Sequence, residues 1–472
     1  MTPEERNLKE RVWEALLDKK RETATELITK YFLEKNYIYT TRNDEKSEVW
    51  IYEDGIYIPQ GKTFIKEFTR KILEVAYSPH LANQIVAKIE TDTYIDAQKF
   101  FDNNIPNEIC CLNGILNLDT KELTEWDPEK IFFNKIDVNY DPEAKCEEIS
   151  KFFSQVLPAE DDQRTIEELF GFCLYKDYFI EQAIMMLGEG RNGKSKTLDI
   201  LKRFLGNNSY TGISLQDFEN DKYKSSEMFG KLANMGGDVS NKTLDQTGIF
   251  KSLTGRDPIN ASRKFLNDIT FVSYAKQIFA TNNLPKTNDF SNAFWERWVF
   301  LVFPYTFEPE EELERLRKVL SVEDFRKYKL RDTDIVNKIT TQDELDGLLL
   351  LALAGLDRLK KNKKFTSSKS AEDTKQLWIR EADSFHAFCI ENVEQDPDFC
   401  ITKKNLKKKY QKYAKKHRCV PETDKSIMYT LTRFFGAMSE RRMVNGEQEY
   451  IWDGICFKDG EDSIDLNGGI SN

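Results

Sequence analysis

The stretch GEGRNGKS, residues 188–195, decides the fold of the central part of the chain. It matches G-x-x-x-x-G-K-[ST], the pattern of a loop that binds phosphate. Glycines let backbone N–H groups point inward at phosphate oxygens, and the helix that follows directs its positive end at the same anion. The alternative is a glycine turn that merely joins a strand to a helix.

The last two residues of this motif predict the bound groups. Lys194 would reach the β- and γ-phosphates of ATP, and the Ser195 hydroxyl would ligate Mg²⁺. The residues that we expect to contact the nucleotide are Gly188, Glu189, Gly190, Arg191, Asn192, Gly193, Lys194, Ser195 and Lys196.

The sequence on either side has the pattern that such a loop requires. The apolar run AIMML at 183–187 predicts a buried strand, and regularly spaced leucines after residue 195 predict a helix. Further strands are expected at 270–274, 277–281 and 298–303. Strands that alternate with helices predict an α/β fold with a mostly parallel sheet.

Phosphoryl transfer to water also needs an acidic residue that holds the metal ion and orients the water. It needs a cation that stabilises the negative charge developing in the transition state. Asp238 ends a modestly apolar segment and could coordinate Mg²⁺ or activate water, or it could be a surface or capping residue. Asn282 follows a strand and could hold the attacking water or sense the γ-phosphate, or it could be an ordinary turn residue. Arg297 could reach a neighbour's ATP, or it could be a cation–π or salt-bridge partner. Lys276, just before the strand of Asn282, could approach nucleotide or DNA.

Composition and charge limit the classes of protein to which the chain can belong. It has 472 residues, enough for several domains, with 40% hydrophobic and 32% charged residues, as in soluble globular proteins. The net charge of −11 means that nucleic-acid contacts must come from local basic clusters. Eight cysteines without a C-x-x-C pair and only three histidines argue against a structural zinc site and a His-based centre. We find no secretory signal and no apolar run of about 20 residues, so we expect a cytoplasmic protein without membrane contact.

Changes in pattern along the chain predict five segments. Turn signals at Asp54-Gly55 and Asn113-Gly114 predict hairpins among helices near the start. A polar run at 366–370 predicts a linker, and an acidic end rich in Gly and Asn predicts disorder. We expect an N-terminal α+β domain over 1–140, a nucleotide-binding core over 141–307, a helical lid and linker over 308–370, a small separate domain over 371–458 and a disordered tail over 459–472.

A basic surface is expected in the small C-terminal domain. Residues 403–418 hold nine lysines or arginines and no acid, while Leu406, Tyr410 and Tyr413 recur at helical spacing. The pattern predicts an amphipathic helix that presents lysines to DNA, or alternatively an ordinary solvated lysine face. The lysines that we expect to contact DNA phosphates are Lys403, Lys404, Lys407, Lys408 and Lys412.

The order of these motifs resembles that of superfamily 3 helicases. It consists of GEGRNGKS at 188–195, Gly-Asp at 237–238, ATNNLP at 280–285 and Glu-Arg at 296–297. The chain is similar to the phage and plasmid primase-helicase group, whose relatives include the poxvirus primase-helicase. Residues 384–454 resemble the C-terminal winged-helix domain of that group, and the segment LNGILNL from residue 112 resembles the domain before its motor.

The resemblance implies an AAA+-type P-loop ATPase core, a hexameric ring and 3′→5′ movement on single-stranded DNA. In such a ring Lys194 and Ser195 would bind ATP and Mg²⁺, and Asp238 would be the second acid. Asn282 would be the polar sensor, and Arg297 the arginine finger supplied to a neighbouring subunit.

The resemblance also implies a hairpin in the central channel of the ring. The matching region is 255–265, in which Arg263 and Lys264 would contact DNA phosphates and Phe265 a sugar or base. An ordinary solvated loop is the alternative for Arg263 and Lys264.

Two features depart from this group. Its second motif often has paired acids, whereas Gly237 precedes Asp238 here, so the division between metal binding and water activation stays open. Relatives often carry a primase domain, for which the first residues of this chain offer neither the length nor a paired-acid pattern. We therefore expect no primase activity and a separate primase or polymerase partner.

The sequence thus predicts an ATP-dependent DNA helicase of a virus or plasmid replication system, acting on single-stranded and forked DNA as a homo-oligomeric ring. The alternative is a DNA-binding replication initiator or loader whose ATPase controls assembly without unwinding. A small-molecule kinase is a third reading, against which Arg297 and the basic C-terminal segment argue.

Overall fold

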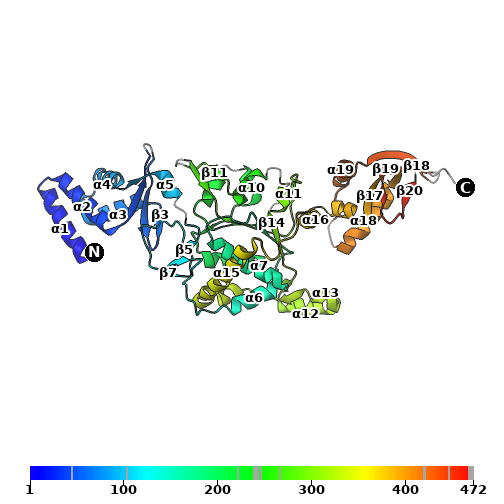
Figure 1. Cartoon of the computed structure of the whole chain (residues 1–472), viewed down its shortest axis with the longest axis horizontal. Helices are drawn as coiled ribbons and strands as arrows, with labels where there is room; N and C mark the ends of the chain where they lie inside the picture. Colours follow the sequence, from blue (N-terminus) through cyan, green and yellow to red (C-terminus); the bar gives the residue numbers. More distant parts are fainter. Residues whose placement is uncertain are drawn as a thin grey trace. The chain divides into compact units, whose positions relative to one another are not determined.

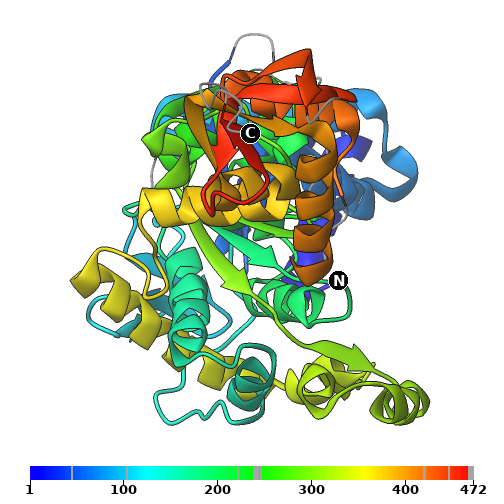
Figure 2. The ribbon, with the colours of Figure 1, turned by 90° about the vertical axis from the view of Figure 1, so that its right-hand side faces the viewer.

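The computed structural model describes residues 1–43, 46–102, 105–220, 223–237, 244, 247–264, 266, 268–417, 421–444 and 447–465. The contacts divide the chain into two compact units, both drawn in Figures 1 and 2. Unit 1 comprises residues 1–238, 246–282 and 297–368, and unit 2 comprises residues 239–245, 283–296 and 369–472.

Unit 1 begins with helices packed on a small sheet (Figure 1). The hairpin predicted at Asp54-Gly55 is confirmed, because Tyr52 pairs with Tyr57 in antiparallel strands. The sheet has the order β3-β2-β1-β4, and apolar side chains of four helices and two strands share one buried core. The elements are α1 (Pro3–Leu17), α2 (Arg21–Lys35), β1 (Ile38–Thr41), β2 (Val49–Glu53), β3 (Ile56–Ile58), α3 (Gly61–Leu73), η1 (Glu74–Ala76), α4 (Pro79–Asp92), β4 (Tyr94–Ile95) and α5 (Ala97–Phe101).

A three-stranded sheet follows and joins the largest core of unit 1. It contains β5 (Glu108–Cys111), β6 (Gly114–Asn117) and β7 (Leu123–Thr124). The hairpin predicted at Asn113-Gly114 is confirmed, because Ile109 pairs with Leu116. Both side chains are fully buried in the same apolar cluster as the central sheet.

A five-stranded parallel sheet forms the centre of unit 1. Its order is β14-β8-β13-β10-β9, and every neighbouring pair is parallel. The mostly parallel sheet predicted from the sequence is confirmed. Because β8 lies between β14 and β13, the residues that follow β8 and β13 meet at one edge. The strands are β8 (Ala183–Leu187), β9 (Tyr210–Thr211), β10 (Ala233–Gly236), β13 (Lys276–Thr281) and β14 (Trp298–Val302).

The strand predicted at 270–274 lies outside this sheet. Residues Ile269–Val272 form β12, which pairs antiparallel with β11 (Pro258–Ala261) in a separate hairpin. Ile269 and Phe271 are buried while the residues between and after them are exposed. Such alternation is typical of a strand that has one face exposed to solvent. The prediction that this strand belongs to the parallel sheet was therefore wrong.

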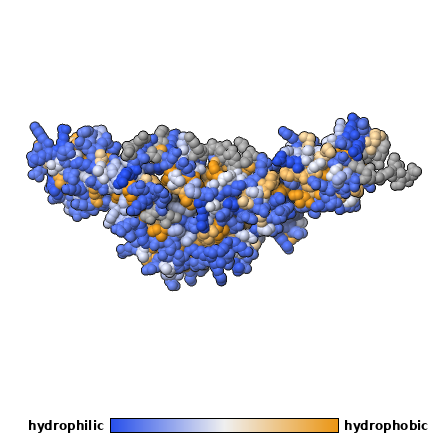
Figure 3. Space-filling view, turned by 45° about the horizontal axis from the view of Figure 1, so that its top comes forward, coloured by the Kyte–Doolittle hydropathy of each residue, from blue (hydrophilic) through white to orange (hydrophobic). Residues whose placement is uncertain are grey.

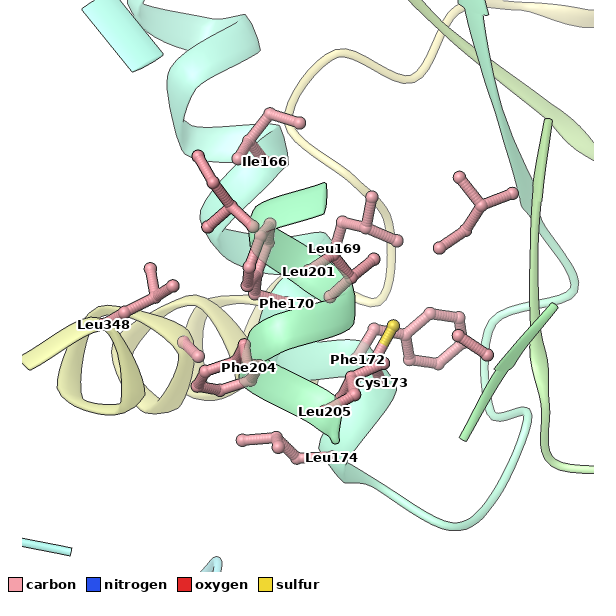
Figure 4. Packing of buried hydrophobic residues seen from close by; sticks show 14 of the residues in the cluster. Ile166, Leu169, Phe170, Phe172, Cys173, Leu174, Leu201, Phe204, Leu205 and Leu348 are labelled. Carbon is pink, nitrogen blue, oxygen red and sulfur yellow. The ribbon is translucent and has the colours of Figure 1, made fainter. Parts of the chain in front are cut away.

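Helices cover both faces of the central sheet (Figure 1). On one face α7 (Glu160–Leu174), α8 (Lys194–Leu205) and α15 (Gln342–Asn362) pack together, and Figure 4 shows their side chains in contact. On the other face, Phe250 of α10 (Gly248–Thr254) stacks on Trp298 with ring centroids 4.6 Å apart. This two-sided burial of apolar surface is the main source of stability for the sheet.

The other elements of unit 1 connect or flank the central sheet. Strands β15 and β16 form a parallel pair, with two helices between them in the chain. These elements are α6 (Glu148–Val156), α9 (Leu215–Asn220), η2 (Lys224–Met228), β15 (Thr306–Glu308), α12 (Glu310–Val319), α13 (Val322–Phe325), β16 (Tyr328–Leu330) and α14 (Ile335–Ile339).

Unit 2 combines helices with an antiparallel sheet of order β18-β19-β17-β20. Leu406 and Tyr410 are buried in its core, which confirms the amphipathic helix predicted there. Ile464 pairs with Cys400 at the edge of β17, so the predicted disorder is wrong for this part of the tail. The elements are α11 (Asn292–Trp295), α16 (Ala371–Ala382), α17 (Ser384–Asn392), β17 (Val393–Thr402), α18 (Lys403–His417), α19 (Asp424–Phe434), β18 (Met438–Val444), β19 (Glu447–Phe457) and β20 (Ser463–Asp465).

On the face shown in Figure 3, hydrophilic residues dominate and hydrophobic residues form smaller patches. Among the described residues, no helix has both the length and the apolar character that crossing a bilayer requires.

Candidate nucleotide-binding site

Residues 188–193 form the turn from β8 into α8, at the carboxyl edge of the central sheet. Gly188 and Gly193 have φ angles of 155° and 97°. A Cβ atom at Gly188 would lie 2.6 Å from the carbonyl oxygen of Phe303, and one at Gly193 would lie 2.6 Å from a methyl group of Val156. Both positions therefore require glycine, whereas a Cβ atom at Gly190 would have no described neighbour within 4 Å.

The amine of Lys194 lies inside this turn. Lys194 is buried, and its Nζ donates hydrogen bonds to the carbonyl oxygen of Gly188 and to Oδ1 of Asn282, the latter at 3.1 Å. Asn282 directly follows β13, where Thr281 pairs with Leu187 of β8. Two residues that are 88 positions apart in the sequence thus meet at the carboxyl edge of neighbouring strands.

The turn is held in shape by its neighbours. Asn192 is 3% exposed, and its side-chain amide donates to the carbonyl oxygen of Phe303 at 3.5 Å. The backbone N–H of Phe307 in β15 donates to the carbonyl oxygen of Arg191 at 2.8 Å, and the Arg191 guanidinium pairs with Glu308 at 2.6 Å. These bonds hold the turn to β15 and to Phe303, the residue after β14, so its backbone is preorganised.

A cavity of about 190 Å³ adjoins the turn and the first residues of α8. Its apolar wall comes from Val156 of α6, Phe307 of β15, Leu330 of β16 and Ile335 of α14. A concave apolar space beside a few polar groups is typical of a small-molecule site. These wall residues could not be predicted from the sequence, because they lie in four separate segments and share no motif.

Ser195 and Asp238 are the residues expected to hold Mg²⁺. Ser195 is exposed in the first turn of α8, at the positive end of the helix. Asp238 lies outside the described residues. Strand β10 pairs with β13, with Gly236 opposite Phe279, so the carboxyl end of β10 lies at the same edge of the sheet as the turn.

Arg297 lies at the opposite edge of the sheet. The next residue, Trp298, pairs with Ala183 at the start of β8, whereas the turn follows the end of that strand. Its Nε donates to the Thr254 hydroxyl at 2.9 Å, and its Nη2 pairs with Glu181 at 2.9 Å. The salt bridge that sequence analysis left open as an alternative is therefore present. The full length of β8 separates Arg297 from the turn of its own chain.

The hairpin expected over 255–265 is built from β11 and the segment that connects it to β12. Arg263 makes two hydrogen bonds to the carboxylate of Glu48, at 3.0 and 2.7 Å, and both side chains are mostly buried. Lys264 is exposed, and Phe265 lies outside the described residues. In this structure Arg263 is thus paired with the N-terminal part of unit 1.

Lys276 does not lie near the turn or on a surface. It is 1% exposed at the start of β13, the edge opposite the turn. Its amine donates to the carbonyl oxygens of Tyr175, Asp177 and Tyr274 at 2.7, 3.1 and 2.7 Å. The prediction that Lys276 approaches nucleotide or DNA is therefore wrong, and the residue instead ties three backbone segments together.

The five lysines of α18 that we expected to contact DNA fall into two groups. Lys404, Lys408 and Lys412 are exposed at intervals of one helical turn. Lys407 pairs with Asp424 at 3.1 Å, and the amine of Lys403 lies 4.5 Å from the ring centroid of Trp452. The first group presents a row of cations to solvent, while the second is engaged within unit 2.

Two families match parts of the sequence. Residues 8–158 match the family described as "D5 N terminal like", and residues 186–297 match a family of unknown function (DUF5906). The second match contains the turn, Asn282 and Arg297. Neither match covers half of the chain.

Two curated proteins are similar to part of the chain. One is "Putative helicase L207/L206" of Acanthamoeba polyphaga mimivirus, 22% identical over 296 residues, which are 59% of this chain and 29% of that protein. The other is "Putative helicase V13" of Sputnik virophage, 25% identical over 258 residues, which are 51% of this chain and 31% of that protein. The chain therefore spans less than a third of either relative. It is related to viral proteins named as helicases.

Among solved structures, the C-terminal region of NrS-1 in an apo form matches 90% of this chain and 98% of that chain. The sequence identity is 12% and the TM-score is 0.43. A second apo structure of the same region gives a TM-score of 0.44.

Proposed function

We propose that the chain is the motor of an ATP-dependent DNA helicase in a virus or plasmid replication system. The observation that carries the proposal is the meeting of Lys194 with Asn282 in a preorganised glycine turn at the carboxyl edge of a parallel sheet. The relation to viral proteins named as helicases supports DNA as the substrate. The place of strand β8 inside a five-stranded parallel sheet, between β14 and β13 and with helices on both faces, supports an AAA+-type P-loop core.

In this proposal the phosphates of ATP bind in the turn 188–193, and the base enters the adjoining apolar cavity. Lys194 would leave the carbonyl oxygen of Gly188 and bind the β- and γ-phosphates. Asn282 would then lie beside the γ-phosphate, where its amide orients the attacking water. The hydrogen bond between Lys194 and Asn282 supports these two roles, because both side chains would then meet the same phosphate group.

Ser195 and Asp238 would hold Mg²⁺, which neutralises charge on the phosphates when it is bound. The exposed hydroxyl of Ser195 at the positive end of α8 fits this role. Asp238 would also accept a proton from the attacking water, since no second acid precedes it.

Arg297 would act on a neighbouring subunit. Its place at the amino edge of the sheet excludes it from the turn of its own chain. The Arg297 side chain is 14% exposed and its partner Glu181 is 58% exposed, and in the ring Arg297 would exchange this ion pair for a neighbour's γ-phosphate. This geometry favours a homo-oligomeric ring, which we propose to be hexameric.

The DNA contacts of the proposal come from two places. In unit 1 the hairpin would contact the translocating strand in the channel through the exposed Lys264, and through Arg263 once its ion pair with Glu48 opens. In unit 2 the row formed by Lys404, Lys408 and Lys412 would contact duplex phosphates, and we propose that this unit is a winged-helix domain. Movement of the hairpin on hydrolysis would drag one strand in the 3′→5′ direction.

ATP hydrolysis by the full chain tests the proposal. We expect Mg²⁺-dependent hydrolysis that single-stranded DNA stimulates, and at least a 100-fold loss in Lys194→Ala. Lys202→Ala is the matched control, because Lys202 lies in the last turn of α8 and its amine pairs with Asp199 on the helix surface at 3.2 Å. Equal hydrolysis by wild type and Lys194→Ala would refute the proposal. Hydrolysis without unwinding would favour the initiator or loader.

A further inference from the structure

The segment of residues 283–296 begins directly after Asn282 and ends directly before Arg297. Its contacts make it part of unit 2, whereas Asn282 and Arg297 both belong to unit 1. The chain therefore leaves unit 1 at one residue of the proposed ATP chemistry and returns to unit 1 at another. Because these two residues flank the segment covalently, a displacement of the segment is transmitted along the backbone to both.

Trp378 of α16 contacts this segment close to each end. It is 1% exposed, and its Nε1 donates a hydrogen bond to the carbonyl oxygen of Pro285 at 2.8 Å. Its ring centroid lies 5.4 Å from that of Phe294 and 5.9 Å from that of Trp295. Pro285 is three residues after the proposed sensor, and Trp295 is two residues before the proposed finger. One buried side chain of unit 2 thus holds the segment beside both of these residues.

Lys286 ties the same segment to two further helices of unit 2. Its Nζ lies 2.9 Å from Oδ2 of Asp383 and 3.2 Å from Oε2 of Glu422, and it donates to the Ser426 hydroxyl at 3.0 Å. Asp383 is the N-cap of α17, and Ser426 lies in the first turn of α19. Both carboxylates are mostly buried, so salt screens these ion pairs less than it screens exposed ones.

Glu422 extends this connection to the helix that carries the exposed lysine row. Its backbone N–H donates to the Tyr410 hydroxyl of α18 at 2.8 Å. Tyr410 is buried and lies between Lys408 and Lys412, two members of that row. Unit 2 therefore contains a continuous series of polar contacts from Lys286 to the face that we propose to contact duplex DNA.

We propose that the segment of residues 283–296 regulates ATP hydrolysis by coupling it to DNA bound on unit 2. The inference rests on the proposed function and adds residues outside the nucleotide turn. Duplex on the lysine row would stabilise one position of the segment, and that position would set Asn282 beside the γ-phosphate and direct Arg297 to a neighbouring subunit. Coupling of two binding sites is reciprocal, so a nucleotide in the turn changes the affinity of unit 2 for DNA by the same factor.

Duplex binding with and without a slowly hydrolysed nucleotide tests this inference on the full chain. Fluorescence anisotropy would measure the Kd of a labelled duplex without nucleotide and with ATPγS and Mg²⁺. We expect ATPγS to tighten duplex binding by wild type at least about fivefold, the lower end of typical coupling between sites. In Lys286→Met the ratio of the two Kd values should fall close to one, while the Kd without nucleotide stays that of wild type. Lys286→Arg keeps a cation for both acids and should retain most of the ratio.

Two further variants separate coupling from a merely structural role. Lys409→Met is the matched control, because the amine of Lys409 in α18 pairs with Asp459 at 2.8 Å, away from the segment, and its ratio should equal that of wild type. Trp378→Phe removes the hydrogen bond to Pro285 but keeps an aromatic ring, and it should also lower the ratio. Melting temperatures verify that each variant folds, and a structural role alone would lower them without changing the ratio.

The outcomes distinguish this inference from the proposed function. A wild-type ratio of one, or an unchanged ratio in folded Lys286→Met and Trp378→Phe, would overturn the coupling even if the chain hydrolyses ATP. A ratio that depends on Lys286 in a chain that does not hydrolyse ATP would support the coupling and refute the proposed motor.

Discussion

Lys194, the first residue of α8, donates a hydrogen bond to Asn282, the residue after β13, with Nζ and Oδ1 3.1 Å apart. The bond links the residue that would bind the phosphates to the one that would report on the γ-phosphate. In the proposed complex Lys194 exchanges its bond to the carbonyl oxygen of Gly188 for the phosphates, so Asn282 stays beside the γ-phosphate.

Replacing Asn282 by Ala should therefore separate binding from hydrolysis. We expect the rate of ATP hydrolysis to fall by about 10²-fold, because the attacking water loses its orienting amide, while the Kd for a fluorescent ATP analogue changes by less than about threefold. Asn283→Ala, at the adjacent amide, is the control. Loss of ATP binding in Asn282→Ala would show that the residue shapes the turn rather than the chemistry.

Arg297→Ala should abolish hydrolysis without loss of nucleotide binding, because its edge of the sheet faces away from the turn of the same chain. Removal of an arginine finger lowers the rate by about 10³- to 10⁵-fold. Mixing Arg297→Ala with Lys194→Ala should restore part of the activity, since each variant supplies what the other lacks at a shared interface. No rescue at any mixing ratio would count against a role in a neighbouring subunit.

The glycines of the turn differ in what they tolerate. Gly193→Ala should lower stability by about 1–2 kcal/mol, because φ is 97° and the new methyl group would meet Val156. Gly190→Ala is the matched control, since a Cβ atom there has open space around it, and its melting temperature should equal that of wild type. Equal melting temperatures for the two variants would contradict the described backbone.

Lys176→Met should be more stable than wild type at pH 7, with a free energy of unfolding higher by on the order of 1–3 kcal/mol. Its melting temperature should therefore be higher. Burial lowers the folded pKa of Lys176 to about 7, against 10.5 for the ordinary side chain, so the unfolded chain binds more protons between these values. The free energy of unfolding of wild type therefore rises with pH between these two pKa values. The difference in stability between Lys176→Met and wild type should become smaller towards pH 10. A pH-independent difference would contradict a buried titrating amine. Lys276→Met should be destabilising instead, because it removes three hydrogen bonds to carbonyl oxygens.

The exposed lysines of α18 should set the salt dependence of duplex binding. Replacing Lys404, Lys408 and Lys412 by Ala together should lower the slope of log K against log salt by up to about 3, one for each lost phosphate contact. Lys409→Ala is the control, because its amine pairs with Asp459 at 2.8 Å and lies 4.0 Å from the ring centroid of Phe457. An equal slope in the triple variant and the control would show that this face is merely solvated.

Local patterns predicted much of the fold. The hairpins at Asp54-Gly55 and Asn113-Gly114 follow from turn chemistry, and β8 follows from an apolar run before a glycine turn. The strand at 270–274 was misplaced because four alternating residues do not specify which sheet they join. Strand β10 gave little signal, since ANMG has no β-branched residue, although all four residues are buried.

The site was only partly predictable for the same reason. The motif identified Lys194 and the order of polar residues identified Asn282, but their contact depends on β8 and β13 being neighbours. Tertiary packing brings together the residues of the apolar cavity wall, such as Val156 and Ile335. It also determines the partners of Arg263 and Arg297. No local spacing encodes them, because each pair joins segments that are far apart in the chain.

Unwinding of a 3′-tailed DNA fork tests the central claim most directly. The assay would use the full chain with ATP and Mg²⁺, beside Lys194→Ala and the Lys202→Ala control. The account predicts ATP-dependent strand separation that is lost in Lys194→Ala and retained in Lys202→Ala. Strand separation that persists without ATP or in Lys194→Ala would contradict it.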